Sequence, residues 1–230
     1  MFKAYQLRKK HKWLALLVGW QLFLWSISGL YMTFVDLDII HGDHLVDMPA
    51  PAKISSATIQ PIDAELLQQL APIRQIRLKS YFDLWVYEVI GDKTTTLVSA
   101  SSGKRQQPLT KQQIIQRAKQ IYTGEGDIQS INRLQSYPKE LGSRQKPVWQ
   151  VNFDDPFNPS LYFDPLSGRL ISKRSDLWRV FDALWVLHIM DYWGSNQFEG
   201  YLFRIVAILS LFLTLFGAGL LYFRLKKGQQ

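Results

Sequence analysis

The strongest constraint in this sequence is a pair of long segments without a charged side chain. The first runs from Trp13 to Val35 and the second from Ile205 to Phe223. As α-helices, which rise about 1.5 Å per residue, each would be close to the roughly 30 Å of a bilayer's hydrocarbon core. We therefore predict transmembrane helices at 13–35 and 201–223. A cleaved signal peptide is the alternative for the first, and we disfavour it because the apolar stretch is long and no small-residue cleavage motif follows.

The charges give these helices a direction across the membrane. The chain has 27 Lys and Arg against 19 Asp and Glu, and every acidic residue lies between Asp36 and Glu199. Residues 1–12 and 224–230 carry only basic charges. Because loops rich in Lys and Arg stay in the cytoplasm, we predict two cytoplasmic tails and a periplasmic segment between the helices, in a bacterial inner membrane. The positive charge is thus explained by topology, and no nucleic-acid partner is expected.

Several kinds of chemistry are excluded or unsupported. The chain has no cysteine, which excludes thiolate catalysis, cysteine-ligated zinc and iron–sulfur clusters. It has no G-x-S-x-G elbow, no H-E-x-x-H and no P-loop. A dispersed catalytic triad stays open, but we assign no catalytic residue and expect the isolated chain not to be an enzyme.

The outer segment contains an internal repeat behind a linker at 36–60. The predicted copies are 61–108 and 109–175. Three short matches support them: LKSY at 78–81 with LQSY at 134–137, LWVYEV at 84–89 with VWQVNF at 148–153, and TLVSASSGKR at 96–105 with LYFDPLSGRL at 161–170.

Each copy predicts one helix followed by a small antiparallel sheet. The helices are expected at 63–70 and 110–122, the second with Thr110 as its N-cap. VWQVNF alternates in polarity, so that one face packs on the helix. DPLSG, at 164–168, has the residues of a turn between strands. The fold class is therefore an α+β membrane protein, with a tandem outer domain between two transmembrane helices.

A third apolar segment, VFDALWVLHIMDYWGSN, lies before the second predicted span. It is too short and too polar to cross, and a third span would place the basic C-terminal tail outside. We predict an interfacial amphipathic helix at 177–193, which a break at 194–196 joins to the second span.

These patterns resemble a known family. The second copy is similar to a PepSY domain in its helix with Ala118, its VWQV strand and its D-x-x-S-G turn, and the first copy resembles a degenerate unit. RKKHKW in the N-terminal segment and LHIMDYW before the second span resemble the flanks of PepSY-associated transmembrane proteins. Ala15, where that family often has Gly, and HIMDYW depart from its pattern. Many relatives have four spans, so this chain looks like a half-length form.

The resemblance gives two of the four histidines a role. Since the family includes haem-using ferric-siderophore reductases, His11 and His188 are candidate haem b ligands. The alternatives are an interfacial cation at His11 and pairing with Asp191 at His188. The two histidines lie at opposite membrane faces, about 30 Å apart, so each would need a histidine of another chain.

The other two histidines could bind metal. His41 and His44 form His-x-x-His beside Asp38, Asp43 and Asp47, which suits a divalent cation. An acidic loop with incidental histidines is the alternative.

Two functions follow as expectations. One is an accessory subunit or half-unit of a membrane redox system for iron, siderophore or flavin-linked electron transfer, as a homo-oligomer or with a redox partner. The clusters of small residues in both predicted spans suit such helix packing in the bilayer. The alternative is a membrane-anchored periplasmic PepSY module that modulates a peptidase or binds another periplasmic protein or peptide.

Overall fold

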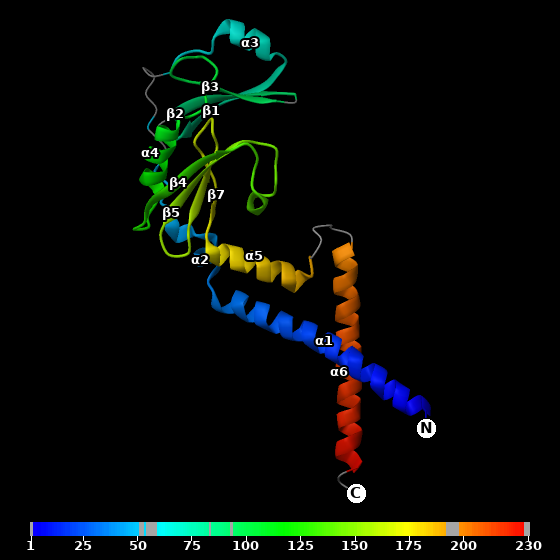
Figure 1. Cartoon of the computed structure of the whole chain (residues 1–230). Helices are drawn as coiled ribbons and strands as arrows, with labels where there is room; N and C mark the ends of the chain where they lie inside the picture. Colours follow the sequence, from blue (N-terminus) through cyan, green and yellow to red (C-terminus); the bar gives the residue numbers. More distant parts are fainter. Residues whose placement is uncertain are drawn as a thin grey trace. The chain divides into compact units, whose positions relative to one another are not determined.

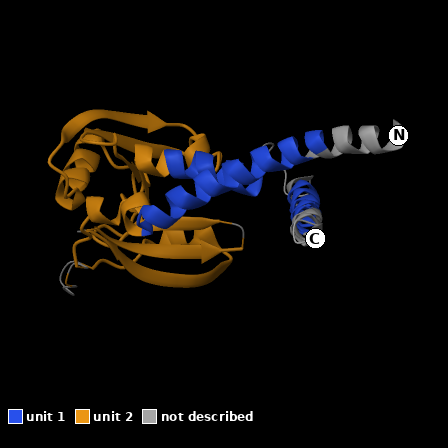
Figure 2. Ribbon diagram, turned by 90° about the horizontal axis from the view of Figure 1, so that it is seen from below, with its two compact units in different colours: residues 1–37, 180–230 blue, residues 38–179 orange. Residues whose placement is uncertain are grey.

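The computed structural model describes residues 2–50, 53, 59–82, 84–92, 94–191 and 198–227 (Figure 1). It divides into two compact units, coloured separately in Figure 2. We call residues 1–37 with 180–230 the helical unit, and residues 38–179 the sheet unit. The sheet unit holds two small antiparallel sheets. The predicted α+β class with two small antiparallel sheets is confirmed.

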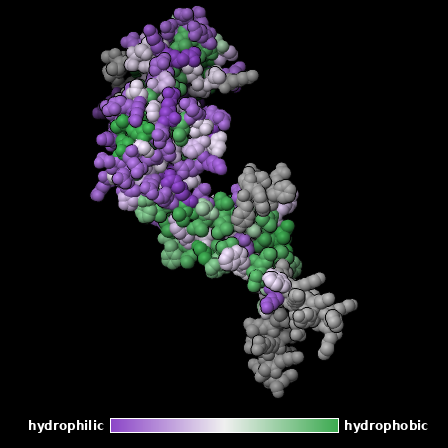
Figure 3. All heavy atoms as spheres, in the orientation of Figure 1, coloured by the Kyte–Doolittle hydropathy of each residue, from purple (hydrophilic) through white to green (hydrophobic). Residues whose placement is uncertain are grey.

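The helical unit begins with one long helix, α1 (Phe2–Phe34). Its stretch Ala15–Phe34 is long and apolar enough to cross a membrane, as a membrane anchor or a signal sequence would be. The helix also includes the basic residues that we predicted as a separate tail at 1–12. Figure 3 shows hydrophobic side chains gathered over the described part of the helical unit, and on α1 Trp13 and Phe34 are 65% and 80% exposed. Such exposure of large apolar side chains is typical of a surface that meets lipid or protein.

The second predicted span is not established by the structure. Helix α6 (Phe198–Lys227) has 30 residues, but within the described residues its apolar stretch is Tyr201–Leu215, which is too short by itself to cross a membrane. The prediction of a span at 201–223 depended on apolar residues beyond Leu215. The structure itself therefore establishes one helix of spanning length in the part of the chain that it describes.

Helices α1 and α6 pack through faces that contain small and polar side chains. On α1, Val18, Gln21 and Ser28 are buried, and on α6, Val206 and Ser210 are buried. Both sets follow the spacing of three or four residues that places side chains on one helix face. The Ser210 hydroxyl donates to the Val206 carbonyl, so its polar group is satisfied within its own helix.

The first sheet of the sheet unit follows a short helix, α3 (Ala64–Leu70). Asp63 caps α3 by accepting from the Glu65 amide at 2.9 Å. The sheet is an antiparallel meander of β1 (Ile73–Tyr81), β2 (Leu84–Gly91) and β3 (Thr95–Ser99).

The second sheet is larger and carries the main core. It is formed by β4 (Asp127–Leu134), β5 (Val148–Asp154), β6 (Ser160–Phe163) and β7 (Leu170–Arg174), in that order. Helix α4 (Lys111–Ile121) precedes it with a capping box between Thr110 and Gln113. The core cluster combines one face of α4 with alternate residues of β5 and β6: Ile114, Ala118, Ile121, Trp149, Val151, Phe153, Leu161 and Phe163. The predicted N-cap and the predicted packing face of VWQVNF are both confirmed.

The two sheets close with equivalent turns. Gly103 and Gly168 both have a φ of 69°, a conformation that favours glycine. In the second sheet Phe163 pairs with Leu170 across the turn, and in the first Val98 forms an isolated bridge with Arg105. The first sheet thus has a single bridge where the second has the full strand β7.

The segment predicted as an irregular linker at 36–60 is partly structured. It contains α2 (Leu37–His41) and a 3₁₀ turn (Asp43–Leu45). Ile40 is 1% exposed, and Val46 forms a bridge with Tyr122 after α4. The prediction was wrong here because the polar composition gave no indication of these tertiary contacts. Residues 51–52 and 54–58 lie outside the described residues.

The helix after the second sheet is shorter than predicted. Helix α5 (Asp176–Ile189) ends four residues before our predicted boundary of 193. Met190 follows with a φ of 61°, which no α-helix continues through. The predicted break at 194–196 lies outside the described residues.

Candidate functional site

His188 is the predicted site residue that the structure places in the most defined surroundings. It lies in the last turn of α5, and within the helical unit its ring meets α1. His188 Nδ1 is 2.8 Å from Ser28 Oγ. The ring also lies beside Trp25, with centroids 6.3 Å apart. Trp25 in turn contacts Phe203 of α6, at 5.5 Å between ring centroids, so all three helices contribute to these surroundings.

The hydrogen bonding of Ser28 favours one arrangement of donor and acceptor between Ser28 and His188. Ser28 Oγ donates to the Leu24 carbonyl at 2.8 Å, and a hydroxyl has one proton to donate. In the neutral tautomer that matches this geometry, Nδ1 donates to Ser28 Oγ. This leaves Nε2 with its lone pair, and no described residue hydrogen-bonds to it.

Gly29 makes room for the imidazole next to Ser28. A Cβ at this position would lie 3.8 Å from His188 Cε1, which is ordinary van der Waals contact. The backbone of α1 thus passes close to the ring edge that lies between the two nitrogens. Small residues allow this close approach of helices.

Two buried polar atoms on the same face of α1 have no partner. Gln21 Nε2 and Trp25 Nε1 are buried without a hydrogen-bond partner in the described structure. Together with Ser28 they follow the i, i+4, i+7 spacing of one helix face. An unpaired buried N–H costs about 1–3 kcal/mol, and such a group in a native protein calls for a partner. The face therefore carries two N–H donors without partners, and one of them belongs to Trp25, whose ring lies beside His188.

This arrangement has the chemistry of a ligand-binding histidine. Histidines that ligate metals usually donate their other ring N–H to an oxygen, which fixes the tautomer and the ring orientation. Ser28 is in that position for His188. The two unpaired donors are suited to carboxylate groups, so the residues present fit a group that combines an iron atom with carboxylates.

The other predicted site residues are His11, His41 and His44. His11 belongs to the described backbone of α1, but its side chain lies outside the described residues. His41 and His44 lie in the sheet unit and are both exposed. Among the described residues no group of three or more His, Asp or Glu side chains could hold a metal ion, so no third ligand supports the predicted metal site at His41 and His44.

Asp164, in the predicted DPLSG turn, and Asp155, after β5, both have structural roles. Asp164 accepts from the Leu166 amide, the Ser167 amide and the Ser167 hydroxyl, at 2.8–3.0 Å. Asp155 accepts from the Tyr122 hydroxyl at 2.5 Å, and burial together with this bond raises the pKa of Tyr122. Both carboxylates thus accept hydrogen bonds that hold local structure.

Sequence reasoning identified His188 but not its partners. Ser28 and Gly29 were interpreted only as small residues for helix packing, and Gln21 and Trp25 as part of an apolar span. The available signal was the spacing of Gln21, Trp25 and Ser28 on one helix face. The partner on α5 lies 160 positions away and could not be inferred.

Comparison with protein-family models, with curated proteins and with solved structures found no match.

Proposed function

We propose that this chain is a non-catalytic subunit of a redox system in the bacterial inner membrane, in which His188 ligates a haem b. The observation that carries the proposal is the hydrogen bond of 2.8 Å between Ser28 and His188 Nδ1. It orients the ring and leaves Nε2 available for iron. The resemblance of the flanking segments to PepSY-associated transmembrane proteins supports the same assignment.

The surroundings of His188 suit a haem in two further respects. Trp25 and Phe203 provide aromatic surface for an apolar macrocycle. Trp25 Nε1 and Gln21 Nε2 are unpaired donors that suit propionate groups. When bound, haem supplies one-electron transfer, while the residues of this chain bind it, orient His188 and exclude water.

We assign two membrane crossings to the chain. α1 contains one stretch of spanning length. α6 has 30 helical residues, and no charged residue occurs in the sequence 205–223. With basic residues at both ends of the chain, the positive-inside rule places both termini in the cytoplasm. The sheet unit, with its two PepSY-like copies, is then periplasmic.

The second iron ligand comes from another chain in this proposal. Two copies, or one copy and a partner, supply the four helices of the longer proteins that the sequence resembles. His11 and His188 lie at opposite ends of this topology, so each meets a histidine of the other chain. Polar and small residues on the faces of α1 and α6 suit such helix association in lipid.

The direct test is an optical spectrum of the full-length protein, expressed with haem supplied and purified in detergent. We expect a Soret band that His188→Gln abolishes, whereas His44→Gln, a matched histidine in the sheet unit, leaves it unchanged. A wild-type protein without a Soret band, alone and co-expressed with its neighbouring genes, would overturn the haem assignment.

The topology has its own test, because the chain has no native cysteine. Single cysteines are introduced at Ser102, which is exposed in the sheet unit, and appended after residue 230. A membrane-impermeant maleimide applied to spheroplasts should label the first and not the second. Labelling of the appended cysteine in intact spheroplasts would contradict the second crossing.

A further inference from the structure

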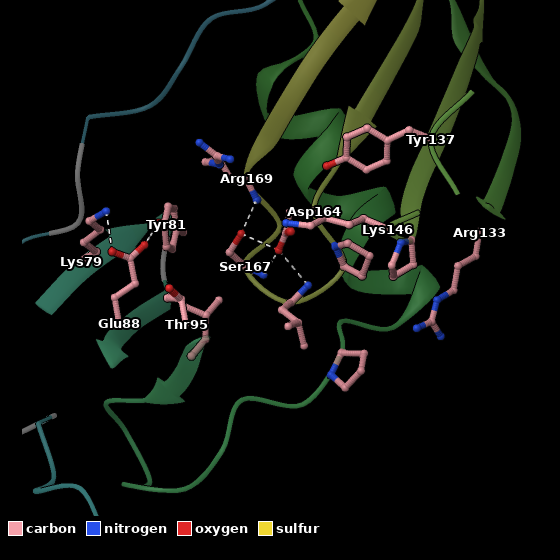
Figure 4. Close-up of a pocket in the computed structure, with 15 residues that line it drawn as sticks. Lys79, Tyr81, Glu88, Thr95, Arg133, Tyr137, Lys146, Asp164, Ser167 and Arg169 are labelled. Atoms are coloured by element: carbon pink, nitrogen blue, oxygen red, sulfur yellow. Dashed lines mark hydrogen bonds and ion pairs between the residues drawn. The ribbon is translucent and has the colours of Figure 1, made fainter. Parts of the chain in front are cut away.

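A cleft of about 510 Å³ lies in the sheet unit between the two sheets (Figure 4). Its walls come from β1, β2 and β3 of the first sheet and from β4, the β4–β5 connection and the β6–β7 turn of the second. The volume lies within the range of about 300–1,000 Å³ found for small-molecule sites. No chemistry described above involves this cleft.

The charged side chains of the cleft are predominantly basic. Four cations line it, against two carboxylates, Glu88 and Asp164. The cations come from both copies of the repeat: Lys79, Arg133, Lys146 and Arg169.

Both carboxylates are already engaged within the protein. Glu88 pairs with Lys79 at 2.7 Å and accepts from the Tyr81 hydroxyl at 3.0 Å. Although burial opposes ionisation, these hydrogen bonds lower the pKa of Glu88 below its ordinary value. Asp164 is held by two amides and the Ser167 hydroxyl inside its turn. These acids therefore offer no free carboxylate to the remaining cations.

Three cations of the cleft are left without an acidic partner. Within the described residues no ion pair involves Arg133, Lys146 or Arg169. The guanidinium of Arg133 lies over the Trp149 ring, 6.0 Å from its centroid, which holds it without neutralising it. In Figure 4, Lys146 and Tyr137 lie toward the same side of the cleft as Arg133.

We propose that this cleft binds a small organic anion with at least two carboxylate or phosphate groups. Guanidinium groups match such oxyanions with paired hydrogen bonds, and a lysine adds a point charge. Tyr137, which also lines the cleft, contributes a hydroxyl, whereas Tyr81, whose hydroxyl donates to Glu88, contributes ring surface. The site requires both copies of the repeat, which gives the tandem arrangement a function separate from the histidine at the membrane.

The test is isothermal titration calorimetry on the full-length protein in detergent, with citrate and pyrophosphate as separate probes. We expect saturable binding of at least one probe, and the stronger probe identifies carboxylate or phosphate as the preferred group. Arg133→Gln combined with Arg169→Gln should weaken binding at least about tenfold, since each removes a charged hydrogen bond. Lys119→Gln, an exposed cation of α4 outside the cleft, should leave the affinity unchanged.

Two outcomes would overturn the proposal. The first is that neither probe binds saturably up to about 10 mM, a concentration high enough to detect very weak sites. The second is that the double variant and the wild type bind the probes with equal affinity. Should the double variant not fold, Lys146→Gln at an exposed position must weaken binding by itself. The haem proposal is tested separately, because His188→Gln should not change the affinity for either probe.

Discussion

Ser28 and His188, which are 160 positions apart, are joined by a hydrogen bond of 2.8 Å between α1 and α5. This bond connects the first apolar helix to the helix that precedes α6, and it orients the imidazole ring of His188. A histidine held in this way differs from an interfacial residue that only faces solvent.

Replacing Ser28 tests whether this bond prepares His188 for iron. We expect Ser28→Ala to lower haem affinity about tenfold, as loss of the oxygen partner of a ligating histidine commonly does, whereas Ser28→Thr should retain it. Ser26→Ala is the matched control, because Ser26 also donates to a carbonyl of α1 but is exposed. Haem titration followed in the Soret region measures all three, and an equal loss in Ser26→Ala would refute the positioning role.

Gly103 should be the most sensitive glycine of the first sheet. A Cβ there would lie 2.2 Å from the Pro61 carbonyl oxygen, which is backbone and cannot rotate away. Gly142→Ala provides the control, because Gly142 also has a positive φ but no atom within 4 Å of the added Cβ. Both substitutions carry about 1–2 kcal/mol of backbone strain.

We therefore expect Gly103→Ala to reduce the free energy of unfolding by at least about 1 kcal/mol more than Gly142→Ala, the cost of steric overlap. Thermal unfolding of the detergent-purified protein, followed by circular dichroism, measures both. Equal unfolding midpoints in the two variants would mean that the backbone at Pro61 shifts to make room for the added methyl group.

The contact between Glu88 and Lys79 should make stability depend on acid pH. The folded protein lowers the pKa of Glu88 from its ordinary 4.5, so its contribution is fully present above that value and is lost as pH falls through the folded pKa. Lys79 is 40% exposed, which limits the contribution to about 0.5–1 kcal/mol. Glu88→Gln should therefore flatten the fall in unfolding midpoint below about pH 5.

The control for this experiment is Glu65→Gln, which removes an exposed carboxylate of α3 that forms no ion pair within the described residues. It should keep the wild-type pH profile. A Glu88→Gln profile that parallels the wild type would show that the pair contributes nothing to acid sensitivity.

The capping box of α4 should stabilise the second sheet. Thr110 Oγ1 accepts from the Gln113 amide, and the Gln113 side chain accepts from the Thr110 amide at 2.9 Å. Thr110→Ala should cost about 1 kcal/mol, whereas Thr110→Ser, which keeps the hydroxyl, should cost less than half of that. Urea unfolding distinguishes the two, and identical midpoints would show that the cap adds no stability.

Some elements could be predicted closely because local sequence decides them. The capped helix α4, the alternating strand β5 and the D-x-x-S-G turn at Gly168 depend on contacts over a few residues, and each lies where its pattern indicates. The segment from Leu37 to Val46 could not be predicted, since its order comes from contacts with α4 that are remote in sequence.

The sequence by itself determined the apolar first helix, the two small sheets and the presence of a histidine before α6. Periodicity, capping and charge placement are local properties, and they suffice for those features. Only the tertiary structure decided that His188 meets Ser28, and that three cations of the second copy line a cleft, shared with the first copy, without acidic partners. The Ser28–His188 contact and the lining of the cleft both depend on side chains that are far apart in the sequence and close in space. Local sequence patterns do not determine such contacts.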